Sequence, residues 1–576
     1  MASATRLTRA SRRSADTIHR VLLVGAALAG WGSSPGLVTA QRALRFPDAL
    51  VAGRIRARID AAGVVTELRA GGEPIHQSAA LLSFYERRGY RPAWGNERGP
   101  TRLVDDLMGA LRRADLEGLR SADYHLAVIE ALLPALWAGA PWGPAVAPDR
   151  WAEIDLLLTD AFLVYGAHLL AGRVHPETLR QEGLANRRST DIAASLESAL
   201  VLGDIAGTLG TLAPPQSGYR RLRDALARHR KVAATGGWPT IPPGPTLHQG
   251  ARGPPVARLR ERLRLEHDLR IDQDADLFDE ALEQALKAFQ RRHGLAADGA
   301  VGAATRAELN VPVERRVEQL ELNLERWRWL PEDLGRRHII VNIAAFELEV
   351  VEQEAVLLAM RVVVGGLENR TPVLSDTMRY LVLNPYWHVP RSISAEEMLP
   401  KVRQDSSYLK RSKLRIFQSS GPDAREVDPT TVDWSAITPA DFPFRLRQDP
   451  GPLNALGRVK FMFINKFNVY LHDTPARALF EATRRDLSHG CIRLHQPIEL
   501  AALLLRQDPR WDRDALLRTL DGAVDSIVPL PDPIPIHLLY RTAWADWDGT
   551  VQFRRDIHGW DTPLWKALRA PLPTQQ

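Results

Sequence analysis

The chain has almost no cysteine: Cys491 is the single one in 576 residues. One cysteine excludes any disulfide within the chain. Neither H-E-x-x-H nor C-x-x-C occurs, and no cluster of aspartates has metal-ligand spacing, so we predict no metal and no cofactor. A lone thiol is either a small apolar core residue or a nucleophile, and its neighbours have to decide between the two.

An excess of one charge and long apolar runs are also missing. The 75 basic residues nearly balance the 69 acidic ones, and no basic run carries interleaved aromatic residues, so we expect no nucleic acid partner. The net charge of +6 fits work beside an anionic polymer or membrane surface, or simply solvated arginine side chains. With 45% hydrophobic and 25% charged residues, the composition is that of soluble globular domains, about two to four at this length.

The first 40 residues have the pattern of a signal peptide. Arginines precede the apolar run VLLVGAALAGW (residues 21–31), and small residues follow, with a V-x-A pattern ending at Ala40. The run is shorter than the roughly 20 residues that span a bilayer comfortably, and no later stretch has the pattern of a transmembrane helix. We therefore predict a signal peptide over 1–40, with an uncleaved N-terminal anchor as the alternative. Membrane contact is expected only through this segment.

Periodicity and composition divide the next part of the chain into three regions. Apolar residues at 3.6-type spacing predict a helical region over 45–235. Glycine and proline are dense over 236–249, which indicates a linker. Two amphipathic stretches, a turn and a short helix at 303–309 predict a small three-helix domain over 250–310.

The remaining chain is rich in strands. β-Branched and aromatic runs bounded by Gly, Pro and Asn predict a β-rich domain over 313–530. A long irregular stretch at about 394–450 interrupts it, and we interpret this insertion as a lid. The segment PIELAALLL (residues 497–505) is predicted to be a helix begun by proline, and residues 531–576 a closing β hairpin and a tail.

The stretch RRDLSHGCIRLHQP surrounds the lone thiol with residues that suit nucleophilic chemistry. A cysteine nucleophile needs a base and oxyanion donors. We assign His472 as the base, because it ends an extended run at the rim of a strand, and the amides of His489, Gly490 and Cys491 as oxyanion donors. Cys491 is expected at the start of a helix, whose N-terminus favours thiolate. A turn residue that only holds the loop is the alternative for His489.

Three further residues are candidates for contact with a substrate. Tyr470 lies two residues before His472 and would share its strand face. Trp387 ends a proline-bounded strand, where an aromatic side chain often lines a cleft, and Asn454 lies in the loop-like GPLNALG. Core packing is the alternative for the two aromatic residues.

Taken together, HDTP…SHGCIRL resembles the catalytic domain of L,D-transpeptidases (YkuD-type fold), with His472, Ser488, His489, Gly490 and Cys491 at matching positions. The stretch FQRRHGLAADGAVGAATRAELN resembles a peptidoglycan-binding domain. The helical first region and the insertion are similar to those of the long periplasmic members. The resemblance implies a multidomain α+β protein with a helical scaffold, a three-helix peptidoglycan-binding domain and a β-rich catalytic domain with a lid-like insertion.

The resemblance also implies a reaction. Cys491 would attack the L,D bond between the third and fourth residues of a donor stem peptide, release D-Ala and form a thioester. An acceptor amine, commonly of meso-diaminopimelate, would then complete a 3→3 cross-link. His472 would be oriented by the backbone carbonyl of Asp473, whose carboxylate either helps or is solvated. Arg493, where shorter members have Asn, would grip a substrate carboxylate, or form only a surface ion pair.

The implied partners are peptidoglycan stem peptides and glycan strands in the periplasm, with other cell-wall synthesis proteins as further candidates. Two alternatives remain open, and a third is disfavoured by the order of the residues in the chain. Water in place of the amine would make an L,D-carboxypeptidase, and loss of catalysis would leave a peptidoglycan-binding scaffold. A papain-like cysteine hydrolase places its cysteine before its histidine, whereas here His472 precedes Cys491.

Overall fold

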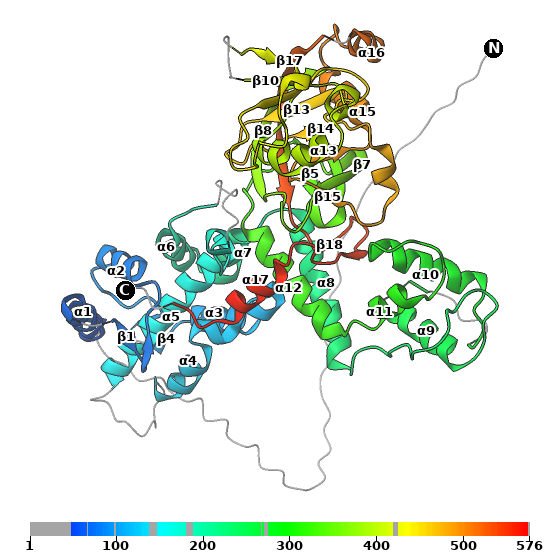
Figure 1. Ribbon diagram of the computed structural model, residues 1–576. Coiled ribbons are helices and arrows are strands. Elements are labelled where there is room, and N and C mark those ends of the chain that lie inside the picture. Colours follow the sequence, from blue (N-terminus) through cyan, green and yellow to red (C-terminus); the bar gives the residue numbers. More distant parts are fainter. Residues whose placement is uncertain are drawn as a thin grey trace, which may run out of the picture. The chain divides into compact units, whose positions relative to one another are not determined.

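The computed structural model describes residues 48–573 except 66, 97–98, 137–146, 180–187, 267, 270–274, 419–423 and 523. The predicted signal peptide over 1–40 lies outside the described residues. The multidomain α+β prediction is confirmed: a helical region comes first, a small helical domain follows, and a β-rich domain comes last (Figure 1).

The first helical region packs around one long apolar helix, α5 (Ala147–Ala171). By length and composition α5 would suffice to cross a membrane, but 83% of its apolar window is buried within the protein. A helix that is apolar all round belongs in a core, and α5 fills that role here. Around it lie α1 (Asp48–Val65), α2 (Ser78–Arg87), α3 (Arg102–Arg112), α4 (Leu126–Leu132), α6 (Ile192–Leu202) and α7 (Ile205–Leu212), with the short pairs β1 (Arg69–Ala70)–β2 (Glu73–Pro74) and β3 (Gly95–Asn96)–β4 (Gly99–Pro100).

The last helix of the region predicted over 45–235 packs against the β-rich part of the chain and not around α5. Helix α8 (Ser217–Ala234) contacts α12 (Val313–Arg328), and its Leu222 and Leu226 join the hydrophobic cluster of the β-rich domain. Helices α8 and α12 therefore connect the first helical region with the β-rich domain.

The small helical domain consists of α9 (Pro254–Leu265), α10 (Glu280–Arg292) and α11 (Ala303–Leu309) around its own core. Gln290, fully buried, ties the turn before α11 to α10: its amide nitrogen donates to Asp298 at 2.6 Å, and its oxygen accepts from the Gly299 amide at 2.9 Å. The turn is thus held by a side chain rather than by packing alone.

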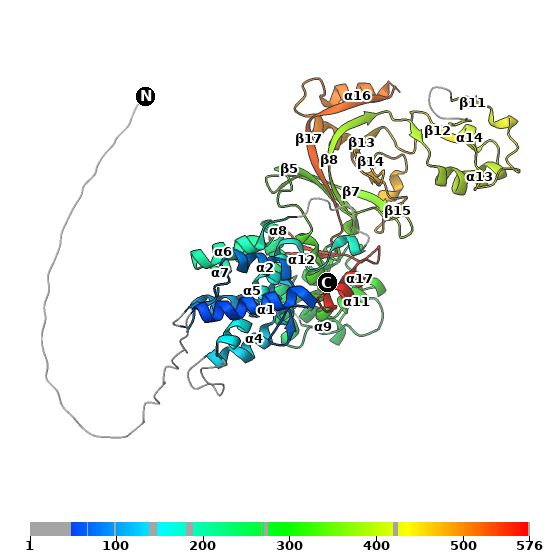
Figure 2. The same ribbon diagram turned by 90° about the vertical axis from the view of Figure 1, so that its left-hand side faces the viewer.

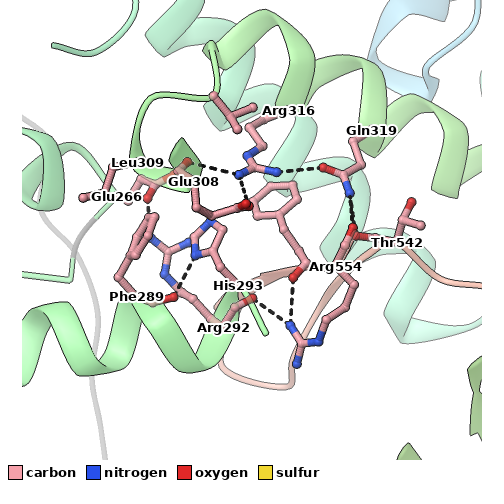
Figure 3. A network of polar contacts seen from close by, with 12 residues as sticks. Glu266, Phe289, Arg292, His293, Glu308, Leu309, Arg316, Gln319, Thr542 and Arg554 are labelled. Atoms are coloured by element: carbon pink, nitrogen blue, oxygen red, sulfur yellow. Dashed lines mark hydrogen bonds and ion pairs between the residues drawn. The ribbon is translucent and has the colours of Figure 1, made fainter. Parts of the chain in front are cut away.

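Polar contacts join this domain to α12 and to the C-terminal hairpin (Figure 3). Arg554 donates from Nη1 to the carbonyl oxygen of Arg292, at the end of α10, at 2.8 Å. Gln319 of α12 donates to the carbonyl oxygens of Thr542 and Arg554, both at 2.8 Å. The hairpin therefore bonds to both helices at once.

The β-rich domain is built on a nine-stranded sheet with the order β15–β7–β16–β14–β13–β8–β17–β5–β6. Because β6 also pairs with β7, the sheet closes on itself. Its inward side chains, such as Val362, Leu381 and Phe461, are fully buried. The strands are β5 (Arg337–Asn342), β6 (Glu347–Glu352), β7 (Ala355–Gly365), β8 (Leu374–Leu383), β13 (Val459–Phe463), β14 (Leu471–His472), β15 (Asp486–Ser488), β16 (Ile492–Leu494) and β17 (Ser526–Leu539).

The insertion has a hydrophobic cluster and a sheet of its own. Four strands pair in the order β11 (Glu426–Val427), β10 (Leu414–Phe417), β12 (Arg445–Gln448) and β9 (Trp387–His388). They pack with the helical segment η6 (Ile393–Met398), α13 (Leu399–Gln404) and α14 (Tyr408–Arg411), which gather into one lobe in Figure 2. The insertion is therefore a folded subdomain.

The C-terminal end differs from the predicted hairpin and tail. Ile534, Ile536 and Leu538 belong to β17, which pairs with β5 and β8, because their alternating apolar side chains are buried in the sheet. The hairpin is formed instead by β18 (Ala543–Ala545) and β19 (Val551–Phe553), and a helix, α17 (Asp561–Arg569), follows where a tail was expected. Helices α15 (Pro497–Leu505), begun by proline as predicted, and α16 (Arg513–Asp521) complete the domain.

Candidate active site

Two adjacent strands, β14 and β16, bring four of the candidate residues to one face of the sheet. Leu471 of β14 lies opposite Ile492 of β16 in parallel register, and both are fully buried in the core. Side chains alternate along a strand, so the flanking residues of both strands point to the other face. This face holds Tyr470, His472, Cys491 and Arg493.

His472 has one fixed ring orientation. Its Nδ1 donates to the backbone carbonyl of Asp473 at 2.5 Å. Because a carbonyl oxygen only accepts, Nδ1 carries the hydrogen and Nε2 keeps its lone pair. Burial lowers the pKa of His472 to about 3, and the positive charges of Arg493 and Lys460 act in the same direction. At neutral pH His472 is therefore an uncharged base.

The Asp473 carboxylate is not solvated, and its help to the histidine is indirect. It is buried, and it accepts from the amides of Thr474 at 2.7 Å and Arg458 at 2.8 Å and from the guanidinium of Arg477 at 2.7 Å. Gly457 packs so closely over it, with φ of +61°, that a Cβ there would overlap the carboxyl group. The carboxylate thus anchors the backbone whose carbonyl holds His472.

The thiol of Cys491 lies against Tyr470. Both the backbone and the hydroxyl of Tyr470 hydrogen-bond to it, and the amide of Ile492 donates to the Tyr470 carbonyl at 3.1 Å. Burial raises the pKa of the thiol, while these hydrogen bonds and the positive charges of Lys460 and Arg493 oppose that rise. Cys491 therefore rests as a thiol, on the same strand face as the neutral imidazole of His472.

Cys491 does not begin a helix, contrary to the expectation from sequence. Residues Ile492–Leu494 form β16, paired with β14 and β7, and the helix starts only at Pro497. The reason is that Ile492 and Leu494 alternate with Arg493 and bury their side chains in the sheet. No helix N-terminus therefore lowers the pKa of the thiol.

A tight turn positions the thiol. Ser488 Oγ donates to the carbonyl oxygen of Cys491 at 2.5 Å and accepts from the Gly490 amide at 3.2 Å. Gly490 has φ of +105°, which a residue with a Cβ rarely adopts, and its carbonyl accepts from Thr371 at 2.8 Å. Of the three amides predicted as oxyanion donors, that of Gly490 is thus already engaged. In the described part of the chain, those of His489 and Cys491 have no acceptor.

His489 connects the turn to the insertion. Its Nε2 lies 2.6 Å from Glu397 of η6, and both side chains are partly exposed. A cavity of about 400 Å³ opens beside this pair. Arg493, His489 and Trp387 line it together with residues of the insertion such as Lys401 and Arg411. Trp387 and Arg493 are thus brought to one cavity, and the insertion forms much of its wall.

Asn454 is placed differently from the other candidates. It is 1% exposed, its amide nitrogen donates to the carbonyl of Pro385 at 2.9 Å, and its oxygen accepts from the Leu456 amide at 2.8 Å. These bonds hold the chain where the insertion rejoins the sheet, and Asn454 is not among the residues that line the cavity.

One residue of this face, Lys460, escaped the sequence reasoning. It lies opposite His472 on β13, and its Nζ is 3.9 Å from the ring centroid of Tyr470. The sequence signal is a lysine in the otherwise apolar strand VKFMF, but only the strand register shows that it faces the thiol. Among the described residues, no group of three or more His, Cys, Asp and Glu side chains is arranged to hold a metal ion.

Three family models match separate parts of the chain. Residues 336–511 match the "L,D-transpeptidase catalytic domain", residues 252–309 the "Putative peptidoglycan binding domain" and residues 79–226 the "Scaffold domain". The chain therefore carries an L,D-transpeptidase catalytic domain together with a peptidoglycan-binding domain and a scaffold domain.

Particular proteins are also similar. A Haemophilus influenzae protein named "Putative L,D-transpeptidase" is 34% identical over 247 residues, covering 43% of this chain and 49% of that protein. The chain thus spans about half the length of the curated relative that it matches. A solved L,D-transpeptidase from Xylanimonas cellulosilytica is 17% identical with a TM-score of 0.16, covering 52% of this chain and 100% of that one. One from Mycobacterium smegmatis is 15% identical with a TM-score of 0.16, covering 35% and 58%.

Proposed function

We propose that this protein is a peptidoglycan L,D-transpeptidase that forms 3→3 cross-links between stem peptides through a thioester at Cys491. The observation that carries the proposal is the shared strand face, on which adjacent strands present a thiol and an uncharged, oriented imidazole. A nucleophile and an oriented base are the parts that acyl transfer needs.

In the proposed acylation, Nε2 of His472 takes the thiol proton as the sulfur attacks the carbonyl carbon between the third and fourth stem residues. The carbonyl electrons move to its oxygen, and the free amides of His489 and Cys491 are the donors for this oxyanion. Collapse breaks the C–N bond, the departing D-Ala nitrogen takes the proton from His472, and a thioester remains.

In the second half, an acceptor amine attacks the thioester carbonyl. The amine gives a proton to His472, the C–S bond breaks, and the sulfur recovers the proton. Water entering instead of the amine would give a tripeptide, which is the carboxypeptidase outcome.

The charges around the cavity support an acidic substrate. Lys401, Arg411 and Arg493 line it against one carboxylate, that of Glu397. A stem peptide ends in a carboxylate, and a guanidinium binds such a group in a bidentate manner. We assign Arg493 to that contact and the Trp387 ring to the wall beside it.

The proposal extends to location and partners. The peptidoglycan-binding domain would hold glycan strands while the catalytic domain joins their stems. The basic and apolar N-terminal pattern supports export, and we propose that the protein works in the periplasm.

Product analysis tests the proposal. The full-length chain and Cys491→Ala are incubated with a disaccharide tetrapeptide, and the products are identified by mass spectrometry. The proposal requires a dimer that has lost one D-Ala, formed by the wild type and absent in the variant. Tripeptide alone would replace the transpeptidase by a carboxypeptidase, and unchanged substrate with both proteins would contradict catalysis.

A further inference from the structure

Lys460 is a charged residue that the scheme above leaves unused. It lies on β13 directly opposite His472, on the face that carries Cys491. Its Nζ is 3.9 Å from the ring centroid of Tyr470, a cation–π contact, and the hydroxyl of the same ring hydrogen-bonds to the thiol. Lys460, Tyr470 and Cys491 therefore form a continuous series of contacts.

The two cations on this face lack a carboxylate partner within the described ranges. Among the described residues, no ion pair joins Lys460 or Arg493 to an acidic residue, whereas Arg458 and Arg477 each have one. Burial lowers the pKa of Lys460 and of Arg493, and Cys491 is the group that acts in the opposite direction on both. Unpaired, partly buried cations cost free energy, which indicates a role for them in the site.

The usual partner of a catalytic thiolate is a protonated histidine. Here His472 is uncharged at neutral pH, so it offers no positive charge to the resting sulfur. We propose that Lys460, together with Arg493, supplies the positive charge that stabilises the anionic sulfur of Cys491. The inference rests on the proposed role of Cys491 as nucleophile and adds a positioning residue to it.

The groups that face the sulfur come from three strands and one turn. Tyr470 and His472 belong to β14, Arg493 to β16 and Lys460 to β13, while His489 lies in the turn before the cysteine. Among them, Lys460 and Arg493 are the residues whose positive charge acts on Cys491.

Lys460 would act twice in the reaction without exchanging a proton. During acylation the thiol proton goes to His472, and Lys460 stabilises the charge that builds up on sulfur as that proton leaves. During transfer to the acceptor the sulfur departs with the C–S bonding pair, and the same charge makes it a better leaving group. The ammonium group keeps its three protons throughout.

Alkylation of the single thiol tests the proposal. The rate of Cys491 carbamidomethylation by iodoacetamide is followed by intact mass across the pH range in the full-length protein. For Lys460→Met we expect the apparent pKa of the thiol to rise by about one unit, which makes alkylation about tenfold slower at neutral pH. Lys460→Arg should restore the wild-type profile, because it restores the charge.

A matched control removes the same charge nearby. Lys466→Met changes an exposed lysine just after β13, and its profile should equal that of the wild type. Lys460→Gln serves as a second neutral variant if the methionine variant fails to fold, as judged by circular dichroism. A folded neutral variant with an unshifted profile would overturn the proposal, as would equal shifts in Lys460→Met and Lys460→Arg. The assay needs no stem peptide, so it stands or falls separately from the transpeptidase reaction.

Discussion

His472 is kept uncharged by burial, and a hydrogen bond of 2.5 Å to the Asp473 carbonyl fixes which nitrogen is free. At the residue scale, the resting pair is therefore a thiol and an imidazole. An ion pair of thiolate and imidazolium would need the opposite shifts of both pKa values. In the proposed reaction, proton transfer to His472 therefore has to accompany the attack.

This pair has a consequence for pH dependence. The folded-state pKa of His472, about 3, lies below the ordinary value of 6.5, so the neutral base persists as the pH falls through 6.5. We predict that kcat/KM for tetrapeptide consumption does not drop between about pH 7 and about pH 5, where an ordinary histidine would become protonated. An acid limb with a midpoint near 6.5 would show that His472 titrates normally and would contradict the assignment.

At the scale of elements, the turn before β13 supports the backbone that orients His472. Gly457 has φ of +61°, and a Cβ at this position would overlap the Asp473 carboxyl group. The backbone strain alone costs roughly 1–2 kcal/mol for a residue other than glycine. Displacing Asp473 also moves the carbonyl that orients His472.

We therefore predict that Gly457→Ala lowers both the melting temperature and the transpeptidase rate, the rate by more than tenfold. Differential scanning fluorimetry and product formation measure the two effects. Gly451→Ala is the matched control, because Gly451 also has a positive φ, +144°, but open space around it. Equal losses in the two variants would mean that backbone strain, and not the support of His472, is responsible.

The elements show how far sequence reasoning reaches. Helix 303–309 and the runs that became β5 to β8 and β13 were predictable, because apolar periodicity and turn residues mark them locally. The strand directly after Cys491 was not predictable. It has only three residues, and its apolar side chains continue into the apolar pattern of the helix that begins at Pro497. The role of Lys460 and the anchoring of Asp473 depend on strand register and on contact with Gly457, which no local pattern encodes.

On the scale of the whole molecule, one hairpin joins parts that are distant in sequence. Arg554 bonds to the end of α10 in the peptidoglycan-binding domain, and Gln319 of α12 bonds to the same hairpin. The small helical domain is thereby held to α12, the helix that precedes the catalytic domain.

Loss of this link should loosen the peptidoglycan-binding domain without unfolding it, since that domain has its own core. We predict that Arg554→Ala increases amide hydrogen exchange at the end of α10 and in the hairpin β18–β19. Arg555→Ala, which removes an exposed neighbouring arginine, should leave the exchange unchanged. Unaltered exchange in Arg554→Ala would show that the link contributes nothing to the attachment.

The central claim is that Cys491 carries the acyl group, and trapping that intermediate tests it most directly. The full-length protein is mixed with tetrapeptide donor in the absence of an acceptor, quenched in acid and mapped by peptide mass spectrometry. The account predicts an adduct equal to the donor minus D-Ala on the peptide that contains Cys491, absent in Cys491→Ala. An adduct on another residue, or turnover without any adduct on Cys491 and undiminished in the variant, would contradict it.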